Sequence, residues 1–389
     1  MQPAEALPAD PLRTAPAPGC PAGNRNRPRP VPKQLRPKMI LPILLCFLLA
    51  VGCSYVRFPS PAARQRTYLL LGAGLILLAV FKQGEGLPDY QGFVENIEGD
   101  TETTLEIKEP AFFAIRWVAD RFPGQRVLVA LLLYALLGIT TKLAAIRRLT
   151  DLWFLALAVY ISNFYMLHDL IQVRAGVASG LLLLCIRPLE ERNLRRFLPT
   201  ALTAMLFHYS AVVILPLWLL NPRTFRKWLW AALIPAAGLL HFAGLDLLTL
   251  ATHLPIPGIQ VKIEVYRQIT ELGLNGWDAF DPFAATFLAR VGMLYLLILC
   301  LEPLQRHNRY TRLLLKIYAV ALASFLLLGN VPVVAARTRE LLSIVEIVLL
   351  PSLTYLGRPR WLTRAIPAAY SLLILLLLLF GNHLLDREL

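Results

Sequence analysis

The feature that most constrains this chain is a series of long apolar runs separated by short polar turns. A membrane-spanning helix needs about 20 mostly apolar residues, and many of the runs meet or approach that length. They lie at 39–56, 67–82, 126–142, 152–167, 171–187, 197–220, 229–250, 283–301, 312–329, 334–356 and 362–380. The sequence therefore predicts an all-α polytopic integral membrane bundle with about 11–12 membrane segments, including re-entrant or broken helices.

Composition supports this reading over the other fold classes. Hydrophobic residues make up 57% of the chain and charged residues 16%, whereas soluble domains are usually about 45–50% apolar and about 25% charged. A transmembrane β-barrel would alternate apolar and polar residues over strands of about 10 residues, and unbroken runs such as Leu372–Phe380 do not. A soluble enzyme and a β-barrel are both disfavoured.

The net charge of +14 is unevenly distributed along the chain. On a soluble protein it would suggest binding to nucleic acid, but in a membrane protein Lys and Arg gather in cytoplasmic loops. One set of loops holds Arg57, Arg64, Arg66, Lys142, Arg147, Arg148, Arg187, Arg192, Arg195, Arg196, Arg223, Arg226, Lys227, Arg306, Arg309, Arg312, Lys316, Arg358, Arg360 and Arg364. We expect this face to be cytoplasmic, the partner to be the lipid bilayer, and nucleic acid not to be a partner.

The predicted outer side and the leader complete the domain organisation. The stretch 83–109 is acidic, with Lys108 as its one basic residue among eight acids, and a second outer loop is expected at 251–282. Residues 1–38 form a basic leader rich in Pro, Ala and Arg that is typical of disorder, followed by a membrane domain at 39–389. The leader and the loop 57–66 both favour the cytoplasm, so either Met39 is the true start or the first apolar run does not cross fully.

The run 197–220 has basic loops at both ends, which a single span would place on opposite sides of the membrane. We therefore expect two shorter pieces that meet near Phe207–Tyr209, with His208 near the break. Non-helical backbone at that depth is tolerated only where it faces protein or a water-filled cavity.

Polar and ionisable residues inside the apolar runs are candidate functional groups because burying them in a membrane is costly. They are His168, Asp169, Gln172, Arg174, His208, Arg290, Arg337, Arg339, Glu340 and Glu346. Structural roles compete with this interpretation. Arg174 could snorkel to the interface, His208 could satisfy a carbonyl at the break, Arg337 and Glu340 could form an ion pair three residues apart, and Arg290 could pair with Asp281 or Glu346. Arg339, Ser343 and Glu346 would form a second polar stripe on the same helix.

No motif in the chain supports a metal or cofactor enzyme. Gly-x-Ser-x-Gly, His-Glu-x-x-His, Cys-x-x-Cys and the phosphate-binding glycine-rich loop are all absent. The five cysteines are scattered without metal-ligand spacing. We therefore expect no cofactor and no metal. One arginine guanidinium can donate two parallel hydrogen bonds to phosphate oxygens, and a His or carboxylate can act as a general base. The arginines, histidines and carboxylates in the apolar runs therefore suit an anionic, lipid-linked substrate with a diphosphate leaving group.

Five short motifs occur in an order that resembles one known family. They are Asp89-Tyr90, Lys108-Glu109-Pro110, Val173–Ala178 around Arg174, Leu206–Ala211 around His208, and Ala336–Leu341 with Arg337 and Glu340. The chain is similar to the EpsG family of Wzy-type exopolysaccharide polymerases over most of residues 67–356. The elements around Arg174 and His208 are the most specific, while the basic leader and the acidity of 91–107 depart from the pattern.

The resemblance implies a multi-pass glycosyltransferase of the bacterial inner membrane that uses no metal. It would join oligosaccharide repeat units carried on undecaprenyl diphosphate at the outer face, alongside a flippase and a chain-length regulator of the same pathway. The implied catalytic candidates are His208, Asp89 and Glu109. The implied diphosphate ligands are Arg174 and Arg337, with Arg339 and Arg290 as further candidates, and Glu340, Asp169 and Gln172 as supporting residues. The alternatives are a flippase or transporter for the lipid-linked unit, and another lipid-linked transferase of the O-antigen ligase or GT-C-like kind.

Overall fold

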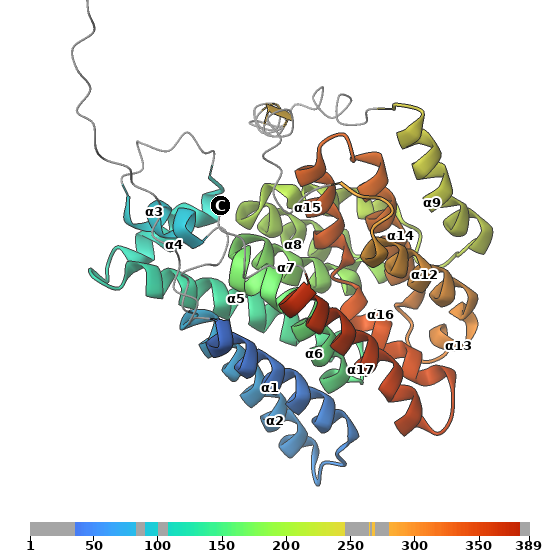
Figure 1. The fold of residues 1–389 in the computed structure, drawn as a ribbon, viewed down its shortest axis with the longest axis horizontal. Helices are drawn as coiled ribbons and strands as arrows, with labels where there is room; N and C mark the ends of the chain where they lie inside the picture. Colours follow the sequence, from blue (N-terminus) through green and yellow to red (C-terminus); the bar gives the residue numbers. More distant parts are fainter. Residues whose placement is uncertain are drawn as a thin grey trace, which may run out of the picture.

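A computed structural model describes residues 36–82, 90–99, 108–245, 264, 267–268 and 280–381, and the elements in these ranges are all helices. They are α1 (Arg36–Tyr55), α2 (Pro61–Val80), α3 (Tyr90–Glu98), α4 (Pro110–Ala119), α5 (Arg126–Leu149), α6 (Trp153–Tyr160), the π-helix η1 (Ile161–Ile171), α7 (Val173–Glu190), α8 (Leu194–Phe207), the 3-10 helix η2 (Tyr209–Leu219), α9 (Lys227–Phe242), α12 (Ala285–Leu299), α13 (Leu301–Gln305), α14 (Thr311–Leu327), α15 (Pro332–Ser343), α16 (Glu346–Ser352), η3 (Leu353–Leu356), α17 (Arg360–Leu376) and η4 (Leu377–Gly381) (Figure 1). Asp89, most of the leader and most of 251–282 lie outside the described residues.

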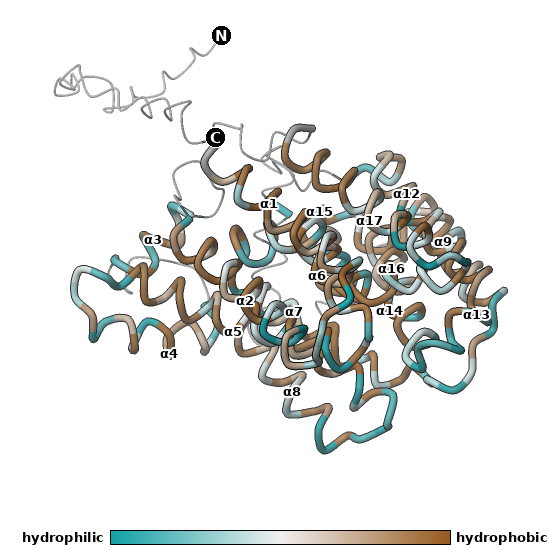
Figure 2. The backbone as a smooth tube through the Cα atoms, turned by 90° about the horizontal axis from the view of Figure 1, so that it is seen from below, coloured by the Kyte–Doolittle hydropathy of each residue, from teal (hydrophilic) through white to brown (hydrophobic). Residues whose placement is uncertain are grey.

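Four helical segments in the described part of the chain are long and apolar enough to cross a membrane: Pro61–Val80, Arg126–Leu149, Trp153–Ile171 and Arg360–Leu379. Shorter apolar helices accompany them. Large apolar side chains such as Leu70 on α2 and Leu373 on α17 are exposed, as expected for surfaces that face lipid. Figure 2 shows the hydrophobic colouring along the helices and the hydrophilic colouring mainly in their connections. The predicted all-α polytopic membrane fold is confirmed.

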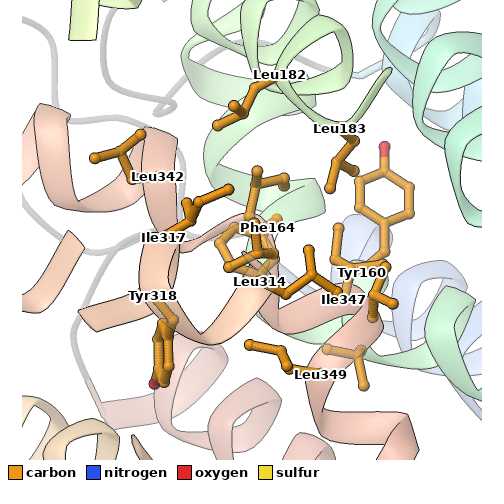
Figure 3. Packing of buried hydrophobic residues seen from close by; sticks show 14 of the residues in the cluster. Tyr160, Phe164, Leu182, Leu183, Leu314, Ile317, Tyr318, Leu342, Ile347 and Leu349 are labelled. Carbon is orange, nitrogen blue, oxygen red and sulfur yellow. The ribbon is translucent and has the colours of Figure 1, made fainter. Parts of the chain in front are cut away.

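The continuous segment formed by α6 and η1 is the centre of the bundle. Nearly all of its residues are buried, whereas only 28% are buried in the spans of α2 and α17. Tyr160 and Phe164 of this segment lie among Leu182 and Leu183 of α7, Leu314 and Ile317 of α14, and Ile347 of α16 (Figure 3). The other helices therefore pack around a core helix that has almost no contact with lipid.

Most predicted runs coincide with a helix, but the run 334–356 does not form one continuous span. It divides into α15, α16 and η3, and α15 ends at Ser343. Ile344 and Val345 separate the two helices but keep right-handed helical dihedrals, so the predicted stripe of Arg339, Ser343 and Glu346 spans two helices and stays a prediction. Glu346 begins a separate helix and is fully buried.

The run 197–220 forms the expected pair of shorter helices. His208 has an extended backbone (φ −156, ψ 117) between α8 and η2. Arg192, just before α8, donates from Nη1 to the carbonyl oxygens of Trp218 (2.5 Å) and Leu220 (3.2 Å) at the end of η2. Phe197 also stacks on Trp218, with ring centroids 5.4 Å apart. Because the start of α8 and the end of η2 are in contact, the segment is a re-entrant hairpin whose tip carries His208.

The loops that carry the predicted cytoplasmic arginines lie together at one end of the bundle. Arg64 donates to the backbone of Asp151, Arg364 to the carbonyl of Ser54, and Arg309 pairs with Glu191. We call the loops 56–60, 150–152, 191–193, 306–310 and 357–359 the arginine-rich end. Grouping these loops on one face was therefore correct.

Lys142 is an exception to that grouping, because it lies inside α5 and is completely buried. Its Nζ is 2.9 Å and 3.0 Å from the carboxylate oxygens of Asp169 in η1 and 2.7 Å from the carbonyl oxygen of Gly176 in α7. Tyr160 donates to the same carboxylate at 2.7 Å. Placing Lys142 on the cytoplasmic face was wrong, because it is buried inside α5, where Asp169, 27 residues away in the chain, neutralises its charge.

The contact between α5, η1 and α7 is too close for side chains at two positions. A Cβ atom on Gly176 would lie 2.1 Å from the carbonyl oxygen of His168, and one on Gly138 would lie 2.7 Å from Oδ1 of Asp169. Both contacts are far below normal van der Waals separation. These glycines let η1 fold back against α7 and let the ion pair form.

We predict that Lys142→Met strongly destabilises the protein because it leaves the buried Asp169 carboxylate without its cation. Loss of one partner of a buried pair costs about 3–5 kcal/mol. The double variant Lys142→Met/Asp169→Leu should recover most of the loss, because it buries no charge. The measurement is the thermal midpoint of the detergent-solubilised protein, with the exposed Arg66→Gln as control. A wild-type midpoint for Lys142→Met would contradict the role of this pair.

Candidate functional site

A buried carboxylate links three broken or terminal helix segments at the end of the bundle where α7 begins. Glu109 precedes α4, Arg174 lies in the first turn of α7, and His208 forms the tip of the α8–η2 hairpin. We call these three residues, together with the backbone of Tyr209, the Glu109 site. It joins residues from predicted motifs up to 100 positions apart.

The geometry of the Glu109 site is ionic and compact. Arg174 Nη1 lies 2.5 Å from Glu109 Oε2, while His208 Nδ1 lies 3.4 Å from the other oxygen, Oε1. The backbone N–H of Tyr209 donates to Oε1 at 3.5 Å. Glu109 is only 1% exposed, so its charge is compensated by protein groups rather than by bulk water.

The local sequence explains why Glu109 points into this site. Pro110 begins α4, where its missing N–H costs no hydrogen bond, and Glu109 has an extended backbone (φ −70, ψ 148) without a side-chain capping bond. Its carboxylate is therefore available for α7 and the hairpin. The neighbouring backbone is also fixed to the hairpin, because Tyr209 donates from its hydroxyl to the carbonyl oxygen of Lys108 at 3.2 Å.

Arg174 is held at a helix N-terminus. Gln172 leaves the helical region (φ −97, ψ 61) between η1 and α7, so α7 starts afresh with its unpaired N–H groups near the site. A helix N-terminus carries a partial positive charge, which adds to the guanidinium. The side chain of Arg174 is 34% exposed, so it can contact a ligand while holding Glu109.

Arg337 adds a further positive charge nearby. It lies half-buried on α15, which packs against both α7 and η2. It is close enough to interact electrostatically with His208 and with the buried His168. The structure thus brings Arg174, Arg337, His208 and Glu109 into one region, as the sequence grouping expected.

Arg290, Glu340 and Arg339 belong to a neighbouring network. Arg290 Nε is 3.2 Å from Oε1 of the buried Glu346, and Asn163 Nδ2 donates to Oε2 at 3.0 Å. Of the two partners proposed for Arg290, Asp281 and Glu346, the structure shows Glu346. Arg339 lies 3.5 Å from Glu340 and over the ring of Phe325. These contacts give Arg290 and Arg339 structural partners that lie outside the Glu109 site.

The remaining sequence candidates are also placed by the structure. Asp169 is buried in the pair with Lys142, and Gln172 marks the break before α7. Asp89 lies outside the described residues. Within the described ranges, no three His, Cys, Asp or Glu residues are arranged to hold a metal ion.

Sequence reasoning missed the partners rather than the charged residues. It named Glu109, Arg174 and His208 separately, but did not expect a single carboxylate to hold the other two. It also missed Tyr209, whose N–H and hydroxyl both bind the segment at 108–109. A signal was present, because Glu109 and Arg174 are opposite charges that each border an apolar run.

Comparison with known proteins identifies the family of the chain. The profile described as the EpsG family matches residues 65–388, which include every residue of the Glu109 site. The chain belongs to the EpsG family. The match extends from α2 to the end of the described chain, so the hairpin, η1 and α15 all belong to this EpsG family region. Neither a search of curated proteins nor one of solved structures gave a match.

We predict that loss of Arg174 destabilises this EpsG family protein more than loss of Glu109. Arg174→Gln leaves a carboxylate buried without its main cation, which should cost about 3 kcal/mol. Glu109→Gln leaves a guanidinium that is one-third exposed and can be hydrated, so it should cost about 1 kcal/mol. Thermal midpoints in detergent test the order, with Glu98→Gln on the surface of α3 as control. An equal or reversed order would contradict the assignment of Glu109 as the buried partner.

Proposed function

We propose that this protein is a polysaccharide polymerase that joins oligosaccharide repeat units carried on undecaprenyl diphosphate in exopolysaccharide synthesis. The observation that carries the proposal is the Glu109 site in a chain of the EpsG family. There a buried carboxylate orients a histidine on one side and a ligand-accessible arginine on the other. The reaction takes place at the outer face of the bacterial inner membrane, opposite the arginine-rich end.

The transfer step is a substitution at the sugar carbon that carries the diphosphate. A hydroxyl oxygen of the acceptor unit forms a bond to C1 of the reducing-end sugar of the donor chain. The bond between C1 and the diphosphate oxygen breaks, and undecaprenyl diphosphate leaves with the electron pair. The hydroxyl proton passes to a base in the site.

Arg174 is proposed to bind the leaving diphosphate. Its guanidinium offers paired donors to phosphate oxygens, and the N-terminus of α7 adds a fixed positive potential at the same place. Arg337 contributes a second cation from α15. Cationic groups fixed in advance stabilise charge that develops on the leaving group, so the reaction needs no metal in this proposal.

His208 is proposed as the base, with Glu109 as the residue that orients it. The ring contacts the carboxylate through Nδ1, which leaves Nε2 to face the acceptor hydroxyl. A carboxylate in this position stabilises the imidazolium that forms when the ring takes a proton. Glu109 is less suited to take the proton itself, because Arg174 already neutralises it at 2.5 Å. Asp89 is an alternative base.

The re-entrant hairpin suits this substrate. The 14 residues of α8 rise roughly 21 Å at 1.5 Å per residue, which is less than the about 30 Å of bilayer hydrocarbon. The tip therefore reaches well across the membrane from the arginine-rich end without emerging. A diphosphate at the interface, with its lipid in the bilayer, can meet such a tip.

A flippase and a chain-length regulator are the proposed protein partners.

We predict that Arg174→Ala and His208→Ala abolish polymer while the protein still inserts in the membrane. Loss of a preorganised charge-stabilising group commonly costs about 10²–10³-fold in rate. Arg174→Lys should retain part of the activity, because it keeps the charge but loses the planar pair of donors. The measurement is polymer formed by each variant in a deletion strain, with Arg66→Gln as a charge-loss control and membrane abundance measured in parallel. Polymer of normal length from both alanine variants would refute the site.

The same strain separates the proposed function from a flippase and from another lipid-linked transferase. A polymerase deletion accumulates single lipid-linked repeat units on the outer leaflet, whereas a flippase deletion accumulates them on the inner leaflet. A ligase deletion leaves a long lipid-linked polymer that is not transferred to its final acceptor. The leaflet and the length of the accumulated glycan therefore identify the step.

A further inference from the structure

A polar cavity opens at the arginine-rich end, and none of its lining residues belongs to the Glu109 site. It has a volume of about 810 Å³ and is formed where α1 ends and where α2, α6 and α17 begin. Arg57, Arg64, Arg360 and Arg364 line it, and Asp151 is the acidic residue among the described lining residues. The cavity is therefore strongly positive, and neither the proposed transfer reaction nor its site uses it.

Three helix N-termini converge on this cavity. Pro61 begins α2, Trp153 begins α6 and Arg360 begins α17, and all three line the cavity. Each N-terminus presents unpaired N–H groups and a partial positive charge. The opposing C-terminus of α1 is already neutralised, because Arg364 Nη1 donates to the carbonyl oxygen of Ser54 at 2.6 Å. The helix ends thus favour an anion.

The single acid does not cancel this charge. The carboxylate of Asp151 accepts a hydrogen bond from the hydroxyl of Tyr355, and Arg64 reaches only the backbone oxygen of Asp151. Arg57 and Arg360 are exposed. Arg364 Nε is buried without a hydrogen-bond partner among the described residues. An unpaired buried donor is costly, so the described partners do not use the full hydrogen-bonding capacity of Arg364.

The rim of the cavity is apolar and lies on a membrane-spanning helix. Trp361 lines the cavity and is 64% exposed. Leu362 and Ile366 follow it on α17 and are also exposed. Exposed tryptophan at the end of a span is typical of the membrane interface. A ligand with an anionic head and apolar chains would meet both the arginines and this rim.

We propose that the cavity binds the phosphate of an anionic phospholipid, with the acyl chains lying along α17. The volume is within the about 300–1,000 Å³ of small-ligand sites and accommodates a phosphoglycerol headgroup. A zwitterionic phospholipid carries the same phosphate with a compensating amine, so its net attraction to four arginines is weaker. The site is therefore selective for lipid charge.

The test uses the full-length protein purified in detergent and offered phosphatidylglycerol or phosphatidylcholine, with bound lipid counted by native mass spectrometry. The variant Arg57→Gln/Arg360→Gln removes two exposed cavity arginines. Its matched control, Arg66→Gln/Arg306→Gln, removes two exposed arginines of the same end that do not line the cavity. Sodium phosphate and pyrophosphate serve as competitors that have no acyl chain.

We expect wild type and control to prefer phosphatidylglycerol and the cavity variant to lose that preference by about tenfold or more, at about 1 kcal/mol per basic residue. Free phosphate at equal concentration should not displace the lipid. Equal binding of the two lipids by wild type, or an equal loss in the control, would overturn the proposal. Displacement by phosphate or pyrophosphate alone would also overturn it and would assign the cavity to a soluble anion.

Discussion

The ion pair between Lys142 and Asp169 fixes the geometry on which the Glu109 site depends. Lys142 binds both the carboxylate in η1 and the carbonyl oxygen of Gly176 in α7, so it spans the reversal between these two helices. The reversal at Gln172 is what turns the start of α7, and with it Arg174, toward Glu109. A buried cation in α5 therefore determines the direction of a helix that begins 31 residues further along the chain.

Breaks in the helices are placed where polar groups have partners. His208 interrupts the α8–η2 hairpin next to Glu109, and the π-helix η1, a form that is frequent at functional sites, ends beside Asp169. In a membrane each unsatisfied backbone group is costly, so such breaks persist only where protein groups or a polar cavity compensate them. The broken segments and the buried charges are consequently found together.

The sequence predicted most of the helices and the candidate charged residues, but not which charged residues form pairs. Apolar runs predicted most helices, and the basic loops on both sides of 197–220 predicted the hairpin and the place of His208. The resemblance predicted the family. The break after Ser343 was missed because 334–356 is apolar enough to be read as one helix. Lys142 was misplaced because its partner lies 27 positions away, and neither hydropathy nor helical period records which charge will neutralise which.

The exposure of the side chains distinguishes the pair of Lys142 and Asp169 from the pair of Arg174 and Glu109. Lys142 and Asp169 have side chains that are 0% and 2% exposed, so no ligand can reach them and their partners cannot be exchanged. Arg174 is 34% exposed while its partner Glu109 is 2% exposed, so one side of that pair is open. An anion can approach the guanidinium from the open side, and Glu109 then still has His208 and the N–H of Tyr209 as partners. In the proposed site, an exposed guanidinium paired with a carboxylate held by several donors lets Arg174 bind the substrate while Glu109 stays compensated, which the fully buried pair of Lys142 and Asp169 does not allow.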